Sequence, residues 1–206
     1  MIVSPITLKP NVKLRYSIPS DTIISLYKDD FGIDVASYFK NLDTVSVFEC
    51  LDSGLLFYSP RDLGGAESLY DQLKLEMPLR YGQDYYPKWK WEYDVSKRYI
   101  GQNDNVYEIG AGNGAFLSSL LKDGVKLASG SELNQKSIES AKEKGVQLEL
   151  ETIEAKASKS VNYYDVVCTF QVLEHVENVH SFLTSALNIL KKGGKLIIAV
   201  PYNDPF

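Results

Sequence analysis

The sequence predicts an α/β protein whose main part is a doubly wound, mostly parallel sheet, with a small extension of helices and a β-hairpin at the N-terminus. Between residues 105 and 201, short β-compatible runs alternate with segments of helical periodicity. This alternation is typical of parallel strands joined by crossover helices. The run YDVVCTF at 164–170 is almost continuously apolar, as expected for a strand in the middle of a parallel sheet.

We expect residues 1–80 to form the extension and residues 81–206 to form the core that contains the sheet. The extension starts with an extended lead-in punctuated by prolines. Its elements are predicted from capping residues, a turn sequence and a proline stop. They are a helix capped by Ser20, a short helix from Asp34, a hairpin over 44–60 and a helix over 66–76 that ends before Pro78.

In the core, a helix is expected from about residue 87 to residue 100. It lies within an aromatic cluster, Tyr81 to Tyr93, whose rings either pack on the sheet or cover a ligand. The later helices end in lysine and glycine, as helix C-termini commonly do. Strands are expected at 105–109, 125–132, 146–151, 164–170 and 195–201, with helices at 114–124, 134–145 and 179–194 and a crossover segment at 153–160.

Composition and charge limit the classes of function. The 206 residues suit one domain, or one domain with an appendage. A net charge of −5 argues against nucleic-acid binding, and no run approaches membrane-spanning length. The two cysteines, Cys50 and Cys168, are too few for a disulfide framework or a cysteine-rich zinc site. We therefore expect a soluble, cytoplasmic protein without a metal site.

One stretch of the core carries most of the functional information: Val106–Leu117, with the sequence VYEIGAGNGAFL. The pattern is typical of a strand, a tight glycine turn and the first turn of a helix. Glycines at 110, 112 and 114 permit φ > 0 and a close approach of the backbone to a bound molecule. The helix that follows directs backbone N–H groups toward the space over the turn. Glu108 adds a negative charge, which disfavours a phosphate and favours a cation.

Two kinds of ligand are compatible with this turn. Gly110, Gly112 and Ala115 satisfy the dinucleotide pattern G-x-G-x-x-A, and Glu132 lies about as far along the chain as a ribose-binding acid should. One interpretation is therefore an NAD(P)-dependent oxidoreductase. The other is a cationic nucleoside site, favoured by Glu108 and by the denser spacing of three glycines.

Four motifs in order resemble those of the class I methyltransferases that use S-adenosylmethionine. They lie within residues 105–201, nearly half of the chain. They are EIGAGNG after the first core strand, SEL after the second, YDVVCTFQVLEHV at the fourth and ILKKGGKLIIAVP at the fifth. This resemblance implies a Rossmann-like methyltransferase fold, with S-adenosylmethionine as the methyl donor.

The resemblance also implies a set of cofactor-binding residues. Glu108 would face the methionine ammonium or a water beside it, Glu132 would accept hydrogen bonds from both ribose hydroxyls, and Leu133 would pack against the adenine. Thr152 and Ile153 follow the third strand, at the level of the adenine. The full set is Glu108, Gly110, Ala111, Gly112, Asn113, Gly114, Glu132, Leu133, Thr152, Ile153, Phe170, Gln171 and Val172.

His175 is the candidate catalytic base, because a histidine suits proton transfer near neutral pH. The alternative is that it forms part of the site wall or scaffold. We expect a small-molecule acceptor, such as a sugar or a secondary metabolite. A catalytically silent, methyltransferase-like binding subunit is a further alternative.

The sequence stops just after the fifth predicted strand, where the resemblance implies two more strands. We therefore expect either a longer natural protein or a homodimer that covers this edge of the sheet.

Overall fold

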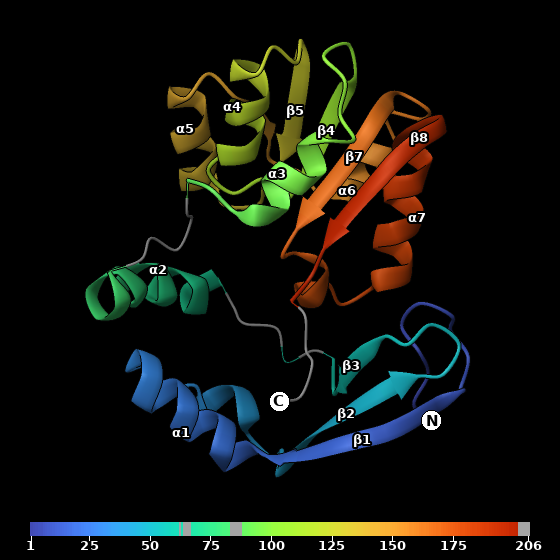
Figure 1. Cartoon of the computed structure of the whole chain (residues 1–206). Coiled ribbons are helices and arrows are strands. Elements are labelled where there is room, and N and C mark those ends of the chain that lie inside the picture. The colour runs from blue at the N-terminus through green and yellow to red at the C-terminus, as the bar shows by residue number, and fades with distance from the viewer. Residues whose placement is uncertain (62, 64–66, 83–87, 202–206) are drawn as a thin grey trace. The chain divides into compact units, whose positions relative to one another are not determined.

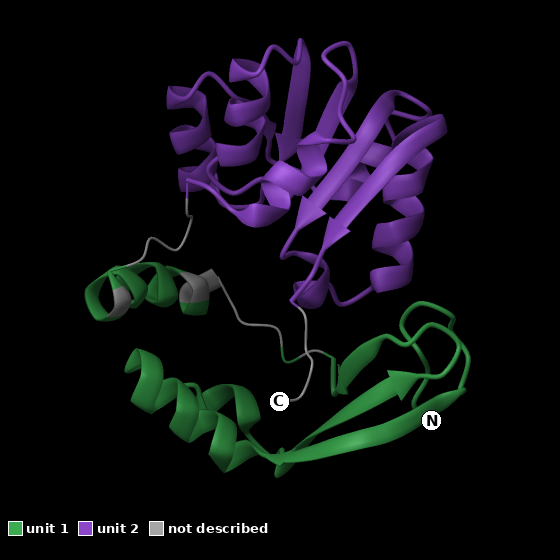
Figure 2. Cartoon of the chain, viewed as in Figure 1, with its two compact units in different colours: residues 1–85 green, residues 86–206 purple. Residues whose placement is uncertain are grey.

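The computed structural model describes the chain except for residues 62, 64–66, 83–87 and 202–206. The chain divides into two compact units, residues 1–85 and residues 86–206 (Figure 2). The first unit has a sheet of three antiparallel strands, and the second has a sheet of five parallel strands (Figure 1). None of the described helices combines the length and the apolar character needed to cross a bilayer.

The second unit confirms the predicted doubly wound α/β fold. Its strand order is β6-β5-β4-β7-β8, and every neighbouring pair is parallel. The order reverses at β4, because the chain runs outward through β5 to β6 and then returns to place β7 on the other side of β4. In open α/β sheets this reversal leaves a crevice at the carboxyl ends of the strands, where ligands bind.

The elements of the second unit alternate as the sequence predicts. They are α3 (Trp91–Lys97), β4 (Asn105–Ile109), α4 (Ala115–Lys122), β5 (Leu127–Ser131), α5 (Gln135–Glu143), β6 (Gln147–Glu149), α6 (Ile153–Ala157), β7 (Tyr164–Phe170), the short 3-10 helix η2 (Leu173–His175), α7 (Val179–Ile189) and β8 (Leu190–Ala199).

Helices cover both faces of this sheet (Figure 1). On the face of α3, α4 and α5, the rings of Tyr93, Phe116 and Phe170 pack together with centroids 4.9 to 5.3 Å apart. On the face of α6 and α7, Phe182 and the other buried side chains of α7 pack around Tyr107 of β4. Because both faces are covered, β4 and β7 are buried at almost every position.

The first unit confirms the predicted hairpin and adds a strand to it. Its elements are β1 (Val12–Pro19), α1 (Ser20–Phe31), η1 (Ala36–Phe39), β2 (Thr44–Cys50), β3 (Leu56–Ser59) and α2 (Glu67–Tyr81). β2 and β3 pair as predicted, but β1 pairs antiparallel with β2, where the sequence predicted only an extended lead-in. The strand character of β1 comes from its pairing with a strand about thirty residues away in the sequence and not from its own residue pattern.

Ser20 is the first residue of α1 and makes no side-chain cap, so its predicted capping role is wrong.

The predicted end of the helix before Pro78 is also wrong, because α2 continues to Tyr81. Arg80 pairs with Glu76 (3.1 Å), and this ion pair spans the proline. The helix ends only at Gly82, whose N–H donates to the carbonyl of Pro78 (3.0 Å) and whose φ is +62°. A single missing N–H is therefore tolerated near the end of this helix.

α3 is shorter than the predicted helix from residue 87 to residue 100. Lys90 is extended, with φ −137° and ψ 147°, and the helix begins at Trp91. The indole Nε1 of Trp89 donates to Asp94 (2.8 Å), so the residue before Lys90 is joined to the helix by a side-chain hydrogen bond and not by a further helical turn. Tyr85 and Tyr86 of the predicted aromatic cluster lie outside the described residues.

α7 ends at Ile189, although the sequence predicted a helix that continues through residue 194. Ile189 and Leu190 are both buried, and Leu190 already pairs with Tyr164 of β7. The pairing resumes at Lys195, so residues 191–194 form an irregular insertion in which Gly193 has φ +80°. Gly193 and Gly194 thus lie in an irregularity of β8 and not at the end of the helix.

Gly130 provides a test of the pairing between β4 and β5. It lies opposite Glu108, and a Cβ at Gly130 would be 2.4 Å from the carbonyl oxygen of Glu108 and 3.2 Å from Cδ1 of Leu117. Because the nearest atom belongs to the backbone, the strands must move apart. We expect Gly130→Ala to lower the free energy of unfolding by about 1–3 kcal/mol, measured by urea denaturation followed by near-UV circular dichroism.

Gly101→Ala is the matched control for this prediction. A Cβ at Gly101 would find its nearest atoms 3.5 Å away, which is ordinary van der Waals contact. This variant should stay within about 0.5 kcal/mol of the wild type. Equal losses in the two variants would show that close strand contact is not what Gly130 provides.

Candidate functional site

The glycine loop, Gly110 to Gly114, follows β4 and is fixed to the end of β5. The N–H groups of Gly110 and Ala111 both donate to the carbonyl oxygen of Ser131 (2.9 and 3.0 Å). The N–H of Gly112 donates to Oε2 of Glu132 (2.8 Å). With φ values of +69°, +54° and +71° at its three glycines, the loop needs residues without a Cβ. The predicted glycine turn is therefore a loop with a defined shape.

Close packing adds a second reason for glycine at two of these positions. A Cβ at Gly110 would be 2.5 Å from Cγ2 of Val172, which follows β7. A Cβ at Gly114 would be 2.9 Å from Cβ of Ala141 on α5. The loop thus contacts both halves of the doubly wound sheet, and the sequence-predicted residues Gly110 and Val172 lie side by side.

Glu108 is a buried acid at the carboxyl end of the central strand. Only 3% of its surface is exposed, and its Oε2 atom has no hydrogen-bond partner among the described residues. Burial raises the pKa of Glu108 well above its ordinary value, and the charge of Glu132 raises it further, while Lys90 acts in the opposite direction. A buried acceptor without a partner is costly, and a cationic group that binds beside it would remove that cost.

Glu132 follows β5 and holds the end of that strand to the glycine loop. Its Oε2 accepts from Gly112, and its Oε1 accepts from the N–H groups of Leu133 (2.8 Å) and Asn134 (3.0 Å). A carboxylate has about four acceptor positions. With these bonds in place, Glu132 can accept one more hydrogen bond. Contact with both hydroxyls of a ribose would require one of the backbone bonds to break.

The three residues predicted to lie near an adenine differ in their exposure: Leu133 and Thr152 are exposed, and Ile153 is buried. Leu133 is 66% exposed, so its side chain is available to a ligand. Thr152 is exposed and caps α6, with its Oγ1 accepting from the N–H of Ala155 (3.3 Å). Ile153 is only 1% exposed and belongs to the core around Tyr107, so its side chain serves packing.

The end of β7 contributes a residue in an uncommon conformation. Phe170 lies in the aromatic core described above, whereas Gln171 has φ +57°. A left-handed conformation is unfavourable for glutamine, and such residues gather at functional sites. Its N–H donates to Ala199 of β8 (2.8 Å), and its Nε2 donates to Oε1 of Glu92 on α3 (3.2 Å). Gln171 therefore ties α3 and β8 to the reversal point of the sheet.

His175 lies on η2, four residues beyond Gln171. Its side chain is 48% exposed, and its Nε2 lies 3.8 Å from Oε1 of Glu174. Burial raises the pKa of Glu174, while the nearby His175 and Lys90 lower it. The pair of side chains places a proton acceptor at the carboxyl end of the sheet, where it is accessible.

Two residues of α3 and its approach were not identified from the sequence. Glu92 bonds to Gln171, and Lys90 is close enough to influence the pKa of both Glu108 and Glu174. Around residues 90–92 the sequence indicates only a helix rich in aromatic residues. The residues nearby do not show which face of this helix contacts the end of β7. Among the described residues, no group of three or more His, Cys, Asp or Glu side chains is arranged to hold a metal ion.

Known proteins with similar sequences agree with this arrangement. Residues 107–198 match the family model described as a methyltransferase domain. A ubiquinone biosynthesis O-methyltransferase from Nitrosomonas europaea is 31% identical over 106 residues, which are 48% of this chain and 45% of that protein. The protein of the same name from Escherichia coli is 30% identical over 100 residues, which are 46% of this chain and 41% of that protein. The chain thus matches less than half the length of these relatives.

Among solved structures, one described as an S-adenosylmethionine-dependent methyltransferase and possible histamine N-methyltransferase, from Thermotoga maritima, is 28% identical, with a TM-score of 0.45. The match covers 52% of this chain and 48% of that chain. The part of this chain that matches the family model begins in β4, contains the glycine loop and Glu132, and ends in β8. The chain therefore contains a methyltransferase domain of the class I S-adenosylmethionine-dependent family.

Proposed function

We propose that this domain binds S-adenosylmethionine at the carboxyl ends of β4, β5 and β7 and transfers its methyl group to a small molecule. The observation that carries the proposal is the buried Glu108 carboxyl, which has an acceptor atom without a partner among the described residues, next to a loop that has no room for a Cβ at Gly110 or Gly114. A diphosphate would place negative charge beside this acid. The amino-acid end of S-adenosylmethionine carries an ammonium group, which suits it.

The residues at this edge of the sheet fit the successive parts of the cofactor, from its amino-acid end to its adenine. Glu108 would meet the ammonium, the loop from Gly110 to Gly114 would lie along the ribose and the amino-acid chain, and Glu132 would accept from a ribose hydroxyl through its remaining acceptor position. Leu133 would cover one face of the adenine. Of the predicted set, Phe170 and Ile153 would support the site from the core and not through their side-chain tips.

The chemistry required of the protein is modest. When bound, S-adenosylmethionine supplies a methyl group on a positively charged sulfur, and transfer is an in-line displacement by the acceptor. The protein has to align the acceptor and exclude water, and such positioning can lower a barrier by about 7–11 kcal/mol. Where the acceptor is a hydroxyl, a base must also take its proton. His175, half exposed beside Glu174, would take this proton.

The finer assignment of the acceptor rests on the relatives. The two curated proteins compared above are named O-methyltransferases. We therefore propose an oxygen nucleophile on a small molecule.

The direct test is isothermal titration calorimetry with S-adenosylhomocysteine, the product of the cofactor, and with NAD(H) as the competing ligand. We expect saturable binding of S-adenosylhomocysteine and none of NAD(H). Binding of NAD(H) alone would overturn the proposal. A protein that binds S-adenosylhomocysteine but methylates no acceptor in a broad screen would instead be a binding subunit.

Glu132→Gln tests the ribose contact. The amide keeps the size of the side chain but places an NH2 group against backbone N–H donors that now meet carboxylate oxygens. We expect the Kd for S-adenosylhomocysteine to rise about 10- to 100-fold, in line with the loss of hydrogen bonds to a charged group. Glu139→Gln on α5, where the carboxylate accepts from the side chain of Gln135 at 3.3 Å, is the control. Equal affinities in these two variants would remove the role of Glu132.

Glu108→Gln should raise stability and weaken binding at the same time. Because burial raises the folded-state pKa of Glu108, its contribution to stability is fully present below its unfolded pKa of about 4.3 and is lost as the pH rises through the folded value. The glutamine variant does not titrate, so its melting temperature should exceed that of the wild type by an amount that grows with pH. Its affinity for S-adenosylhomocysteine should fall about tenfold, because an amide cannot neutralise the ammonium.

Thermal unfolding of both proteins between about pH 5 and pH 8, together with calorimetry at each pH, checks this prediction. Comparing variant with wild type cancels the titration of the other groups. A stability difference that does not change with pH would show that Glu108 is ionised in the folded domain. An unchanged affinity would show that it does not meet the ammonium.

A further inference from the structure

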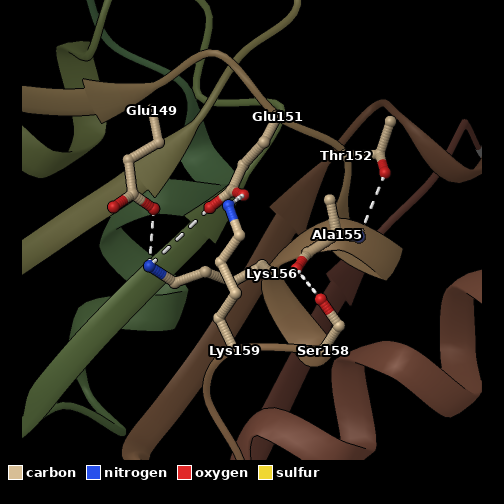
Figure 3. A network of polar contacts seen from close by, with 7 residues as sticks. All are labelled: Glu149, Glu151, Thr152, Ala155, Lys156, Ser158 and Lys159. Carbon is tan, nitrogen blue, oxygen red and sulfur yellow. Dashed lines mark hydrogen bonds and ion pairs between the residues drawn. The ribbon is translucent and has the colours of Figure 1, made fainter.

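Two lysines of the α6 region hold the segment that follows β6 (Figure 3). Nζ of Lys156 lies 2.5 Å from Oε2 of Glu149 and 3.8 Å from Oε1 of Glu151. Nζ of Lys159 lies 2.8 Å from the other carboxylate oxygen of Glu151. Lys156 thus links Glu149, the last residue of β6, to Glu151, and Leu150 is the residue between them in the sequence.

Lys156 differs from Lys159 in its surroundings. Lys156 is 8% exposed, whereas the side chain of Lys159 is 67% exposed. The ammonium of Lys156 also lies over the rings of Tyr107 (5.2 Å to the centroid) and Tyr164 (5.8 Å). Burial by itself lowers the pKa of Lys156, but the contacts with Glu149 and Tyr164 outweigh it and raise the pKa above its usual value. Lys156 is therefore a positively charged group held among carboxylates and aromatic rings.

The segment that Lys156 holds is connected directly to Glu132. Glu149 lies opposite Ser131 in the register of β5 and β6, and its carbonyl oxygen accepts from the N–H of Glu132 (3.0 Å). On the other side, Thr152 caps α6. Residues 149–152 therefore start at the level of the proposed ribose contact and continue along the same edge of the sheet, where the base of a bound nucleoside would lie.

Both carboxylates of this segment are already paired with lysine side chains. Glu149 is engaged by Lys156, and Glu151 is engaged by both lysines. Besides these paired carboxylates, the segment offers the exposed Leu150, the hydroxyl of Thr152 and its own backbone N–H and C=O groups. Backbone groups discriminate between bases only if the segment is held in one position, because hydrogen-bond geometry is strict.

We propose that Lys156 is a positioning residue for the nucleobase end of the cofactor: by bridging Glu149 and Glu151 it holds residues 149–152 in the conformation that reads the adenine, without touching the cofactor itself. This inference rests on the proposed binding of S-adenosylmethionine. It concerns the base end of the site alone and requires nothing of Glu108 or His175.

The experiment compares two ligands on the intact chain. S-adenosylhomocysteine carries adenine, whereas S-inosylhomocysteine carries a carbonyl oxygen in place of the exocyclic amine and a hydrogen on the adjacent ring nitrogen, so the donor and acceptor pattern of this edge of the base is reversed. Calorimetry gives the Kd of each for the wild type, Lys156→Met and Lys159→Met. We expect a wild-type preference for adenine of at least about tenfold, since a polar site rejects an analogue that leaves its groups unpaired. In Lys156→Met the preference should fall to within about threefold, while Lys159→Met keeps the wild-type ratio.

The ratio of the two affinities separates positioning from a merely structural role. Partial unfolding would lower the active fraction equally for both ligands and would leave the ratio unchanged. Glu149→Gln is a second variant, in case Lys156→Met does not fold; its side chain is half exposed, and it keeps an acceptor for Lys156 while removing the charge. It should lower the ratio to an intermediate value.

Each outcome is decisive. A wild type that does not bind S-adenosylhomocysteine overturns the proposed function. A wild type that binds both ligands equally, or variants at Lys156 and Glu149 that keep the full preference for adenine, overturn only the inference on Lys156. Loss of the preference in Lys159→Met to the same extent would also overturn it, because the ammonium of Lys159 pairs with Glu151, whereas Glu149 is held by Lys156.

Discussion

The hydrogen bonds that join the glycine loop to the end of β5 are the interaction on which the rest of the site depends. One carbonyl oxygen, that of Ser131, accepts from both Gly110 and Ala111, and the next residue along the chain, Glu132, accepts from Gly112. Three consecutive N–H groups of the loop are thus held by the last residue of β5 and the residue that follows it. A loop bound in this way has its shape before any ligand arrives, and a preformed site loses less conformational freedom on binding.

The same arrangement explains why an acid without a partner persists in the core. Glu108 lies on the strand that leads into the loop, and its neighbours in β5 and β7 are fixed by regular pairing. The sheet supplies enough stability to hold a carboxyl group in a position that is unfavourable for it. Groups with strongly shifted pKa values gather at functional sites for this reason. The burial of Glu108 is therefore better explained by binding than by folding.

The parts of the structure that depend on local pattern could be predicted from the sequence. The five parallel strands, the glycine loop and the place of Glu132 after β5 follow from alternation, glycine spacing and position. Features that depend on a distant partner could not be predicted. β1 is a strand because β2 pairs with it, and α2 passes Pro78 near its C-terminal end, where Arg80 pairs with Glu76 across the proline. The left-handed backbone of Gln171 and the contact between Glu92 and Gln171, 79 positions apart, have no signature in the residues around them.

The conformation of Gln171 limits how this domain can be re-engineered. With φ at +57°, the position accepts glycine or asparagine readily but is hostile to valine, isoleucine and threonine, whose branching at Cβ clashes in that region. Libraries that diversify the mouth of the crevice should therefore hold position 171 to unbranched side chains. Glu92, on a regular helix, has no such restriction, and α3 is the side from which the crevice can be reshaped.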